Sequence, residues 1–278
     1  MATFPPKPNA LDQVFCVRKP IIGMVHSLPM PGAPRFKDHS LDEVYKFGID
    51  EALRLKEGGV DGIILENGWD LPFAKPEEIG SETVAAMAVL GWQIREATGL
   101  PLGINILANA ALASLAAAKA CKAKFIRVNQ YVNGYVANEG FIEGKAGQIM
   151  RYRSWIEAED VKIIADVHVK HGSHSITADR PLAEQARDAE FFDADVLIAT
   201  GQRTGDATPV SEVKGIQEAV SLPVIIGSGL TVDNCREIMS VADGAVVGSS
   251  IKERGIWWET VSVERLKALM EIVKELRA

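Results

Sequence analysis

The sequence has few cysteines and no long apolar run, and each shortage excludes a class of protein. Its 278 residues include three cysteines, Cys16, Cys121 and Cys235, which are too widely spaced for a zinc motif or a disulfide framework. Reduced thiols, as in a cytosol, are the expectation. No apolar run reaches the ~20 residues of a membrane-spanning helix, and the first residues lack the features of a secretory signal. We therefore expect a soluble, cytoplasmic protein without an integral membrane segment.

Positive charge is also in short supply. The chain has 30 Lys and Arg against 37 Asp and Glu, a net charge of −7. It contains no aromatic-basic module of the kind that binds nucleic acid, so we expect no nucleic-acid partner. Hydrophobic residues make up 47% of the chain, which is the proportion of an ordinary globular protein.

The sequence does contain a regular alternation of short β-branched runs and helical stretches. Such alternation is typical of a parallel sheet covered by helices, and eight repeats favour a single closed (β/α)8 barrel, a TIM barrel. The alternative is an open doubly wound sheet, but the dinucleotide fingerprint of that fold is missing after the first strand, at residues 22–26. We expect a barrel domain over residues 20–278 and, at residues 1–19, an N-terminal arm or lid under the barrel.

The expected strands and helices follow from the period of the apolar residues and from residues that end helices, such as Gly59 and Gly99. The expected strands are residues 20–27, 62–68, 102–108, 125–131, 162–170, 196–201, 224–227 and 244–248. The expected helices are residues 41–57, 81–97, 110–122, 144–159, 181–192, 209–220, 233–241 and 263–276. The helix at 110–122 is rich in alanine, which suits close packing against another subunit in a homo-oligomer.

The strand at residues 162–170 carries the strongest indication of a site. Side chains alternate along a strand, so Asp166, His168 and Lys170 are predicted to share one face. Ionisable groups are costly to bury, and a structural core strand would carry Val or Ile there. A catalytic site is the better explanation.

Polar residues also end the other strands, and active sites of such barrels lie at the C-terminal strand ends. These candidates are His26, Glu66, Asn105, Arg127 and Asn129. Structural roles stay open for them: a hydrogen bond from His26 to a loop, an internal Glu66–Arg127 ion pair, or satisfaction of backbone groups by Asn105. Convergence of five adjacent strands favours a site.

Glycines and hydroxyls follow the last two strands, where many barrels bind phosphate. Gly227, Ser228 and Gly229 follow the seventh strand, and Gly248 and Ser249 follow the eighth. Glycines let the backbone approach an anion, and N–H and hydroxyl groups complete its shell. Ordinary tight turns are the alternative. Thr200 and Arg203, after the sixth strand, would add a hydroxyl and a positive charge.

These residues do not identify a cofactor. A divalent metal ion is one alternative, with His26, Glu66, Asp166 and His168 as ligands, although the spacing matches no zinc signature. Lys170 as a Schiff-base amine is another, but a charge partner is favoured. Trp257 and Trp258 add aromatic bulk, for which packing on a helix surface is favoured over a binding platform.

Several of these segments together resemble the BtpA family. The matching segments are residues 22–34 (IGMVHSLPMPGAP), 61–67 (DGIILEN), 125–129 (FIRVN), 166–171 (DVHVKH), 227–229 (GSG) and 243–250 (DGAVVGSS). They span residues 20 to about 255, and Ser27 and Met30 stand where many relatives have Leu. The resemblance implies a TIM barrel similar to SgcQ-like proteins and, for photosynthetic relatives, a role in photosystem I biogenesis.

Two functions follow as hypotheses. The first is an enzyme that acts on a small phosphorylated metabolite, a sugar phosphate or nucleoside-derived compound, by isomerase, lyase or metal-assisted hydrolytic chemistry. Asp166 and His168 would move protons, and Arg127, Lys170 or a metal would stabilise an oxyanion. The second is a non-catalytic assembly or stability factor for a membrane complex such as photosystem I.

Overall fold

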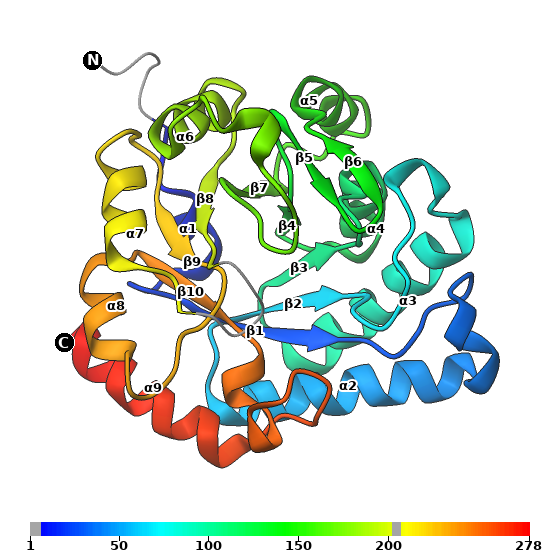
Figure 1. Ribbon diagram of the computed structural model, residues 1–278. Helices are drawn as coiled ribbons and strands as arrows, with labels where there is room; N and C mark the ends of the chain where they lie inside the picture. Colours follow the sequence, from blue (N-terminus) through cyan, green and yellow to red (C-terminus); the bar gives the residue numbers. More distant parts are fainter. Residues whose placement is uncertain (1–6, 202–206) are drawn as a thin grey trace.

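The computed structural model describes residues 7–201 and 207–278. Within these residues, eight parallel strands close into a barrel, and helices surround it (Figure 1). The order around the barrel is β1-β10-β9-β8-β7-β4-β3-β2, so barrel strands that follow one another along the chain are neighbours. The (β/α)8 prediction is confirmed.

The barrel strands and the helices have the following bounds. The strands are β1 (Ile21–His26), β2 (Gly62–Glu66), β3 (Leu102–Asn105), β4 (Phe125–Val128), β7 (Lys162–Asp166), β8 (Val196–Ala199), β9 (Val224–Ile226) and β10 (Gly244–Val247). The α-helices are α1 (Ala10–Phe15), α2 (Leu41–Gly58), α3 (Ser81–Thr98), α4 (Ala111–Cys121), α5 (Ala146–Trp155), α6 (Leu182–Phe191), α7 (Val210–Gln217), α8 (Cys235–Val241) and α9 (Val263–Arg277). Short 3-10 helices are η1 (Pro34–Asp38), η2 (Pro76–Glu78), η3 (Ser175–Thr177), η4 (Ser249–Ile251) and η5 (Glu253–Gly255).

Alternate residues of each strand face opposite sides of the barrel wall, which produces two apolar clusters. Ile22 and Met24 of β1 pack inside the barrel, whereas Ile21 and Val25 pack under the surrounding helices. A parallel strand covered on both faces is apolar at nearly every position, which is why these strands appear as continuous apolar runs in the sequence. The inner cluster fills the barrel, so a ligand finds room only at its ends.

Helix α1 covers the end of the barrel at which the strands begin. Its N-cap Asn9 accepts a 2.9 Å hydrogen bond from the backbone N–H of Leu11. Phe15 packs edge-on against Phe125 of β4, with ring centroids 5.6 Å apart, and Ala10 and Leu11 are buried in the inner cluster. Helix α1 therefore closes one end of the barrel.

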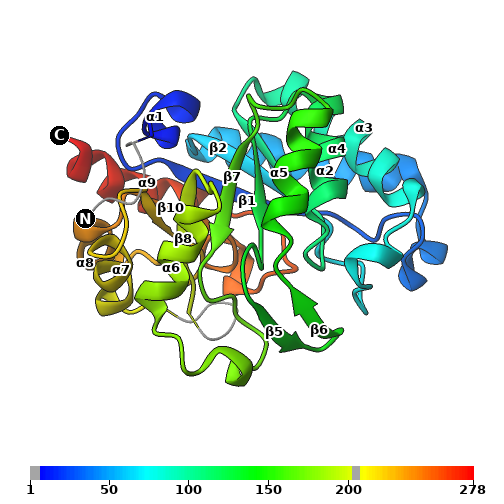
Figure 2. The same ribbon diagram turned by 90° about the horizontal axis from the view of Figure 1, so that it is seen from above.

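A hairpin of β5 (Gly134–Ala137) and β6 (Gly140–Glu143) stands at the other end, away from α1 (Figure 2). The sequence analysis missed this hairpin. Its local sequence does carry the indication, because Asn138 and Glu139 form a two-residue turn before Gly140, whose φ is +97°. Each flanking segment has one aromatic and one β-branched residue, but both lie outside the regular βα alternation from which the strands are predicted.

Strand β7 is shorter than predicted, and this corrects the central expectation about the site. It ends at Asp166 and does not continue to Lys170, so Asp166, His168 and Lys170 do not share a strand face. The chain turns away because Ser173 pairs with Val136 of the hairpin, through backbone hydrogen bonds of 2.8 and 3.0 Å. A Cβ on Gly172 would lie 2.4 Å from the Tyr135 ring, so this turn depends on glycine.

The alanine-rich helix α4 packs closely within this molecule. Ala111, Leu115 and Ala118 are buried, and so is Cys121. A Cβ on Gly91 of α3 would lie 3.0 Å from the Cys121 sulfur, which shows how near the two helices come. Small side chains on α4 are thus explained by contacts inside one subunit, and a homo-oligomer remains a prediction.

Candidate functional site

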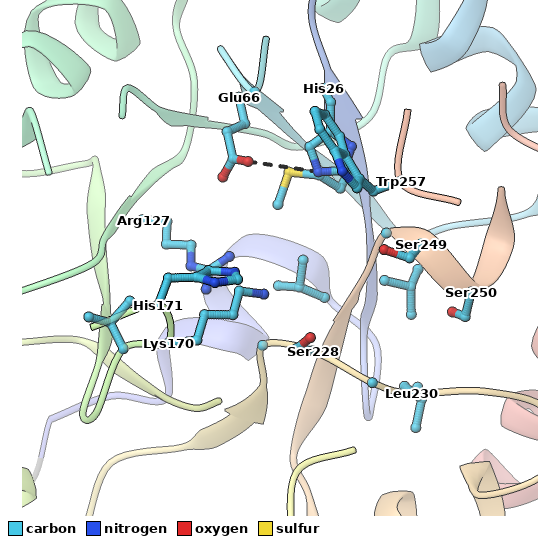
Figure 3. A pocket seen from close by; sticks show the side chains of 18 of the residues that line it. His26, Glu66, Arg127, Lys170, His171, Ser228, Leu230, Ser249, Ser250 and Trp257 are labelled. Carbon is cyan, nitrogen blue, oxygen red and sulfur yellow. Dashed lines mark ion pairs between the residues drawn. The ribbon is translucent and has the colours of Figure 1, made fainter. Parts of the chain in front are cut away.

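A cavity of about 760 Å³ opens at the C-terminal ends of the strands, beside the hairpin. Figure 3 shows side chains from several strands converging on it. Many predicted site residues line this cavity: His26, Glu66, Arg127, Asn129, Lys170, Gly227, Ser228, Gly229, Gly248 and Ser249. Of the other described candidates, Asn105, Asp166, His168 and Thr200 lie outside the lining. Arg203 lies outside the described residues.

His26 and Glu66 lie opposite each other at the ends of the paired strands β1 and β2. His26 Nε2 is 3.7 Å from Glu66 Oε1, as the dashed line in Figure 3 marks. Asn105 donates a 2.7 Å hydrogen bond from Nδ2 to Glu66 Oε2, which holds the carboxyl group in place. Asn105 therefore contacts the cavity only through Glu66.

The environment of this pair favours the neutral form of each group. Burial holds the pKa of His26 well below its ordinary value, and the positive charges of Lys252 and Lys170 add to the effect. Burial also raises the pKa of Glu66. Within the described part of the chain, Nδ1 of His26 is buried and has no hydrogen-bond partner. A neutral imidazole is available as a general base, which takes a proton from a bound substrate and later returns it.

Arg127 pairs with Asp166 and not with Glu66, the partner that the sequence analysis left open. Its Nε and Nη2 each donate a 2.9 Å hydrogen bond to a different oxygen of Asp166. Thr200 donates a further 2.5 Å bond from Oγ1 to Asp166 Oδ1. The Asp166 side chain has 0% exposure, so this carboxylate orients Arg127 and is not placed to exchange protons with a ligand.

His168 belongs to the base of the hairpin and not to the cavity wall. Its ring packs on His174, with centroids 3.6 Å apart, and His174 stacks on Tyr135 at 5.1 Å. Burial, with the charge of His174, lowers the pKa of His168 to about 4. His168 is thus a neutral packing group that joins the segment after β7 to the hairpin, whereas Lys170 reaches the cavity.

The turns after β9 and β10 line the same side of the cavity. Gly227 has no room for a side chain, because a Cβ would lie 2.4 Å from Ile198. Gly229 adopts a φ of +76°, a conformation that glycine tolerates best. Asn234 donates a 2.8 Å hydrogen bond to the Gly229 carbonyl and holds this turn. Two rigid turns with small or hydroxyl side chains therefore meet at the strand ends.

Arg265 is a cavity residue that the sequence analysis missed. It lies in the first turn of α9, lines the cavity, and donates a 3.0 Å hydrogen bond from Nε to the Ser250 carbonyl. This position brings a positive charge next to the turn after β10. The sequence offers only a weak indication of it, namely an arginine at the start of the helix that follows the eighth strand.

Trp257 also lines the cavity, where we had favoured packing on a helix surface. Its ring meets His26 edge-on, with centroids 5.4 Å apart. The loop that carries it is fastened by a buried ion pair between Lys252 and Glu51 of α2, each with 1% side-chain exposure. Glu51 also accepts a 3.1 Å hydrogen bond from the N–H of Val261. The two ends of the loop are therefore anchored to α2.

The four proposed metal ligands are not brought together. Within residues 7–201 and 207–278, no three His, Cys, Asp or Glu side chains form a group that could hold a metal ion. His26 and Glu66 are neighbours, but Asp166 is occupied by Arg127, and His168 packs on His174. The residues present therefore do not fit the metal site that we considered.

In the same described ranges, none of the helices is long and apolar enough to cross a membrane. The fold and the cavity together define a (β/α)8-barrel protein with a polar site at the C-terminal mouth. The chain belongs to the BtpA family, whose model matches residues 17–275.

Relatives match along nearly the whole chain. A protein of Archaeoglobus fulgidus is 40% identical over 258 residues, which cover 93% of this chain and 100% of the relative. The photosystem I biogenesis protein BtpA of Synechocystis is 36% identical over 272 residues, which cover 95% of this chain and 91% of that protein. Family membership is therefore supported by whole-length similarity.

Solved structures share the fold at low sequence identity. Thiamine phosphate pyrophosphorylase from Pyrococcus furiosus has a TM-score of 0.56 and 18% identity, and the match covers 94% of this chain and 97% of that one. Orotidine 5′-monophosphate decarboxylase from Methanocaldococcus jannaschii has a TM-score of 0.54 and 15% identity, over 92% and 98% of the two chains. These likenesses establish the barrel architecture.

Proposed function

We propose that the protein is an enzyme that acts on a small phosphorylated metabolite, in keeping with its family's barrel architecture. One observation carries the proposal: the turns after β9 and β10 open into the same cavity as His26, Glu66 and Lys170. In many (β/α)8 enzymes, phosphate binds at the turns after the last two barrel strands, and catalytic groups come from the ends of other strands. An anchor for the substrate and groups for proton transfer thus share one cavity.

The phosphate would lie between the Ser228–Gly229 backbone and Gly248–Ser249. Backbone N–H groups and hydroxyls at such turns hydrogen-bond to phosphate oxygens, and Arg265 would contribute positive charge. Gly248 leaves space beside His26, because a Cβ there would be 3.4 Å from His26 Cε1. The phosphate would therefore lie within reach of the proton-transfer pair.

The reaction that these groups favour is proton transfer next to a carbonyl, as in an isomerase or lyase. His26, held neutral beside Glu66, would take the proton from the carbon next to the carbonyl and return it later in the reaction. Lys170 and the Asp166-oriented Arg127 would stabilise negative charge on the substrate oxygen. We route no step through a metal ion, since the candidate ligands do not converge.

The test is calorimetric titration of the full chain with ribose 5-phosphate and with inorganic phosphate. Ser249→Asp places a negative charge at the anion site and is expected to weaken binding about tenfold or more. Ser154→Asp, at an exposed position of α5 outside the cavity lining, is the matched control and should bind like the wild type. Absence of binding by the wild type, or unchanged binding by Ser249→Asp, would contradict the proposal.

A second candidate is an assembly or stability factor without catalysis, which the name of the Synechocystis relative favours. The two candidates differ in whether the cavity is needed. Replacing the relative in Synechocystis with this chain, as the wild type and as His26→Gln/Glu66→Gln, tests this. Equal photosystem I levels with both versions would favour the assembly factor, and loss only with the double variant would favour the enzyme.

A further inference from the structure

We infer that the substrate is a phosphate ester whose far end is a planar ring with an N–H donor, of the size of a nucleoside monophosphate. The inference rests on the proposed function, because it takes the position of the phosphate from it. It adds what lies on the opposite side of the cavity, where Asn129 and a group of apolar side chains face the same space.

The cavity spans the mouth of the barrel. In the closed strand order, β10 and β4 stand four places apart among eight strands, so they are diametrically opposite. The turn after β10 and Asn129, just after β4, both line the one cavity of about 760 Å³. That volume lies in the upper part of the range of about 300–1,000 Å³ for drug-sized ligands. A three-carbon phosphate would leave most of it unfilled.

Most side chains on the side opposite the phosphate turns are apolar. They come from the loops after β2, β3 and β7 and from the hairpin: Leu71, Phe73, Leu107, Ala108, Tyr135, Ala137 and Val169. Asn109, Asn138 and Glu139 line the cavity from the same segments. Tyr135 is 6% exposed and is backed by the stacked ring of His174. Sugar hydroxyls placed against such a wall would lose their hydrogen bonds to water without replacement. A flat ring gains from the same contact.

Asn129 is a buried polar side chain on this side, and its amide oxygen points to a donor on the ligand. Its residue exposure is 8%, and its Nδ2 faces Asp166 Oδ2 at 3.5 Å. An ionised carboxylate only accepts, so the amide must turn its N–H₂ toward Asp166 and its oxygen away. Within the described ranges Asn129 Oδ1 has no hydrogen-bond partner. A buried acceptor of this kind is costly to leave unpaired, and a ring N–H would satisfy it.

The experiment compares four probes on the full chain by calorimetry: uridine 5′-monophosphate, adenosine 5′-monophosphate, ribose 5-phosphate and inorganic phosphate. At least one nucleotide is expected to bind about tenfold or more tighter than ribose 5-phosphate. Asn129→Leu should weaken that nucleotide about tenfold, the effect of one lost hydrogen bond, and leave ribose 5-phosphate unchanged. Ribose 5-phosphate thereby serves as the internal control for a folded phosphate site.

The outcomes separate this inference from the function on which it rests. If ribose 5-phosphate binds as tightly as both nucleotides, the ring site is wrong and the phosphate site stands. If no probe binds the wild type, the proposed function itself fails. If Asn129→Leu lowers the urea midpoint of unfolding, the variant is destabilised and Phe73→Ala is used in its place. Phe73 is at a half-buried loop position. Equal weakening of nucleotide and ribose 5-phosphate by Phe73→Ala would also overturn the inference.

Discussion

Arg127 and Asp166 form a doubly hydrogen-bonded ion pair inside the barrel, from neighbouring strands β4 and β7. Both bonds are 2.9 Å long, and the two side chains are 4% and 0% exposed. Arg127 lines the cavity, and its two bonds to Asp166 fix the position of its positive charge there. The acid that seemed the best catalytic group in the sequence thus acts as the support of its neighbour.

The first prediction is that Asp166→Ala lowers the free energy of unfolding by about 3–5 kcal/mol, because it leaves Arg127 buried without its partner. Urea denaturation measures the change. Asp160→Ala, whose side chain is 62% exposed, is the control and should change little. The double variant Arg127→Met/Asp166→Leu should lose less than Asp166→Ala, and an equal or larger loss would count against this explanation.

The second prediction concerns the charge that surrounds His26. Lys170→Met should raise the pKa of His26, because the positive charge of Lys170 is one of the causes that lower it. NMR titration of the imidazole provides the measurement. Lys274→Met, at an exposed position on α9, should leave the His26 titration unchanged. An unchanged titration in Lys170→Met would show that burial and the other cations account for the whole effect.

The third prediction is a loss of stability in mild acid through His168. Its pKa is 6.5 as a free group and about 4 in the folded protein, so between these values the unfolded chain binds more protons. The free energy of unfolding should therefore decrease as pH falls from about 6.5 to about 4. His168→Gln should reduce this slope, whereas His39→Gln, on the far loop after η1, should keep it. Identical slopes in all three proteins would refute the assignment.

The fourth prediction concerns the loop that carries Trp257. Lys252→Met leaves Glu51 buried and unpaired, so we expect a loss of about 3–5 kcal/mol of unfolding free energy. Lys267→Met is the matched control. Lys267 of α9 pairs at 3.3 Å with Glu57 of α2, the helix that also carries Glu51, but this pair is exposed. Its effect should stay within about 0.5 kcal/mol. Comparable losses in the two variants would contradict a special role for the buried pair.

Part of the candidate site was predictable, because polar residues at the ends of apolar runs can be recognised in the sequence. His26, Glu66 and Arg127 were assigned to the cavity from their places at the ends of apolar runs, and the structure places them there. The prediction that Asp166, His168 and Lys170 share one strand face was wrong, because the alternation ends with β7 at Asp166. Arg265 was missed because its contact with Ser250 depends on how α9 packs against the barrel.

The sequence by itself determined the architecture of this protein. Eight βα repeats, with some helices that end at glycines, specify a closed parallel barrel. Strand and helix periods are local properties of the sequence, and β-α-β connections are almost always right-handed. Tertiary structure alone decided which acid pairs with Arg127, where the chain leaves β7 and which side of the cavity is apolar. Those outcomes depend on contacts between residues far apart in the chain, such as Val136 with Ser173 and Lys252 with Glu51, and no local pattern encodes them.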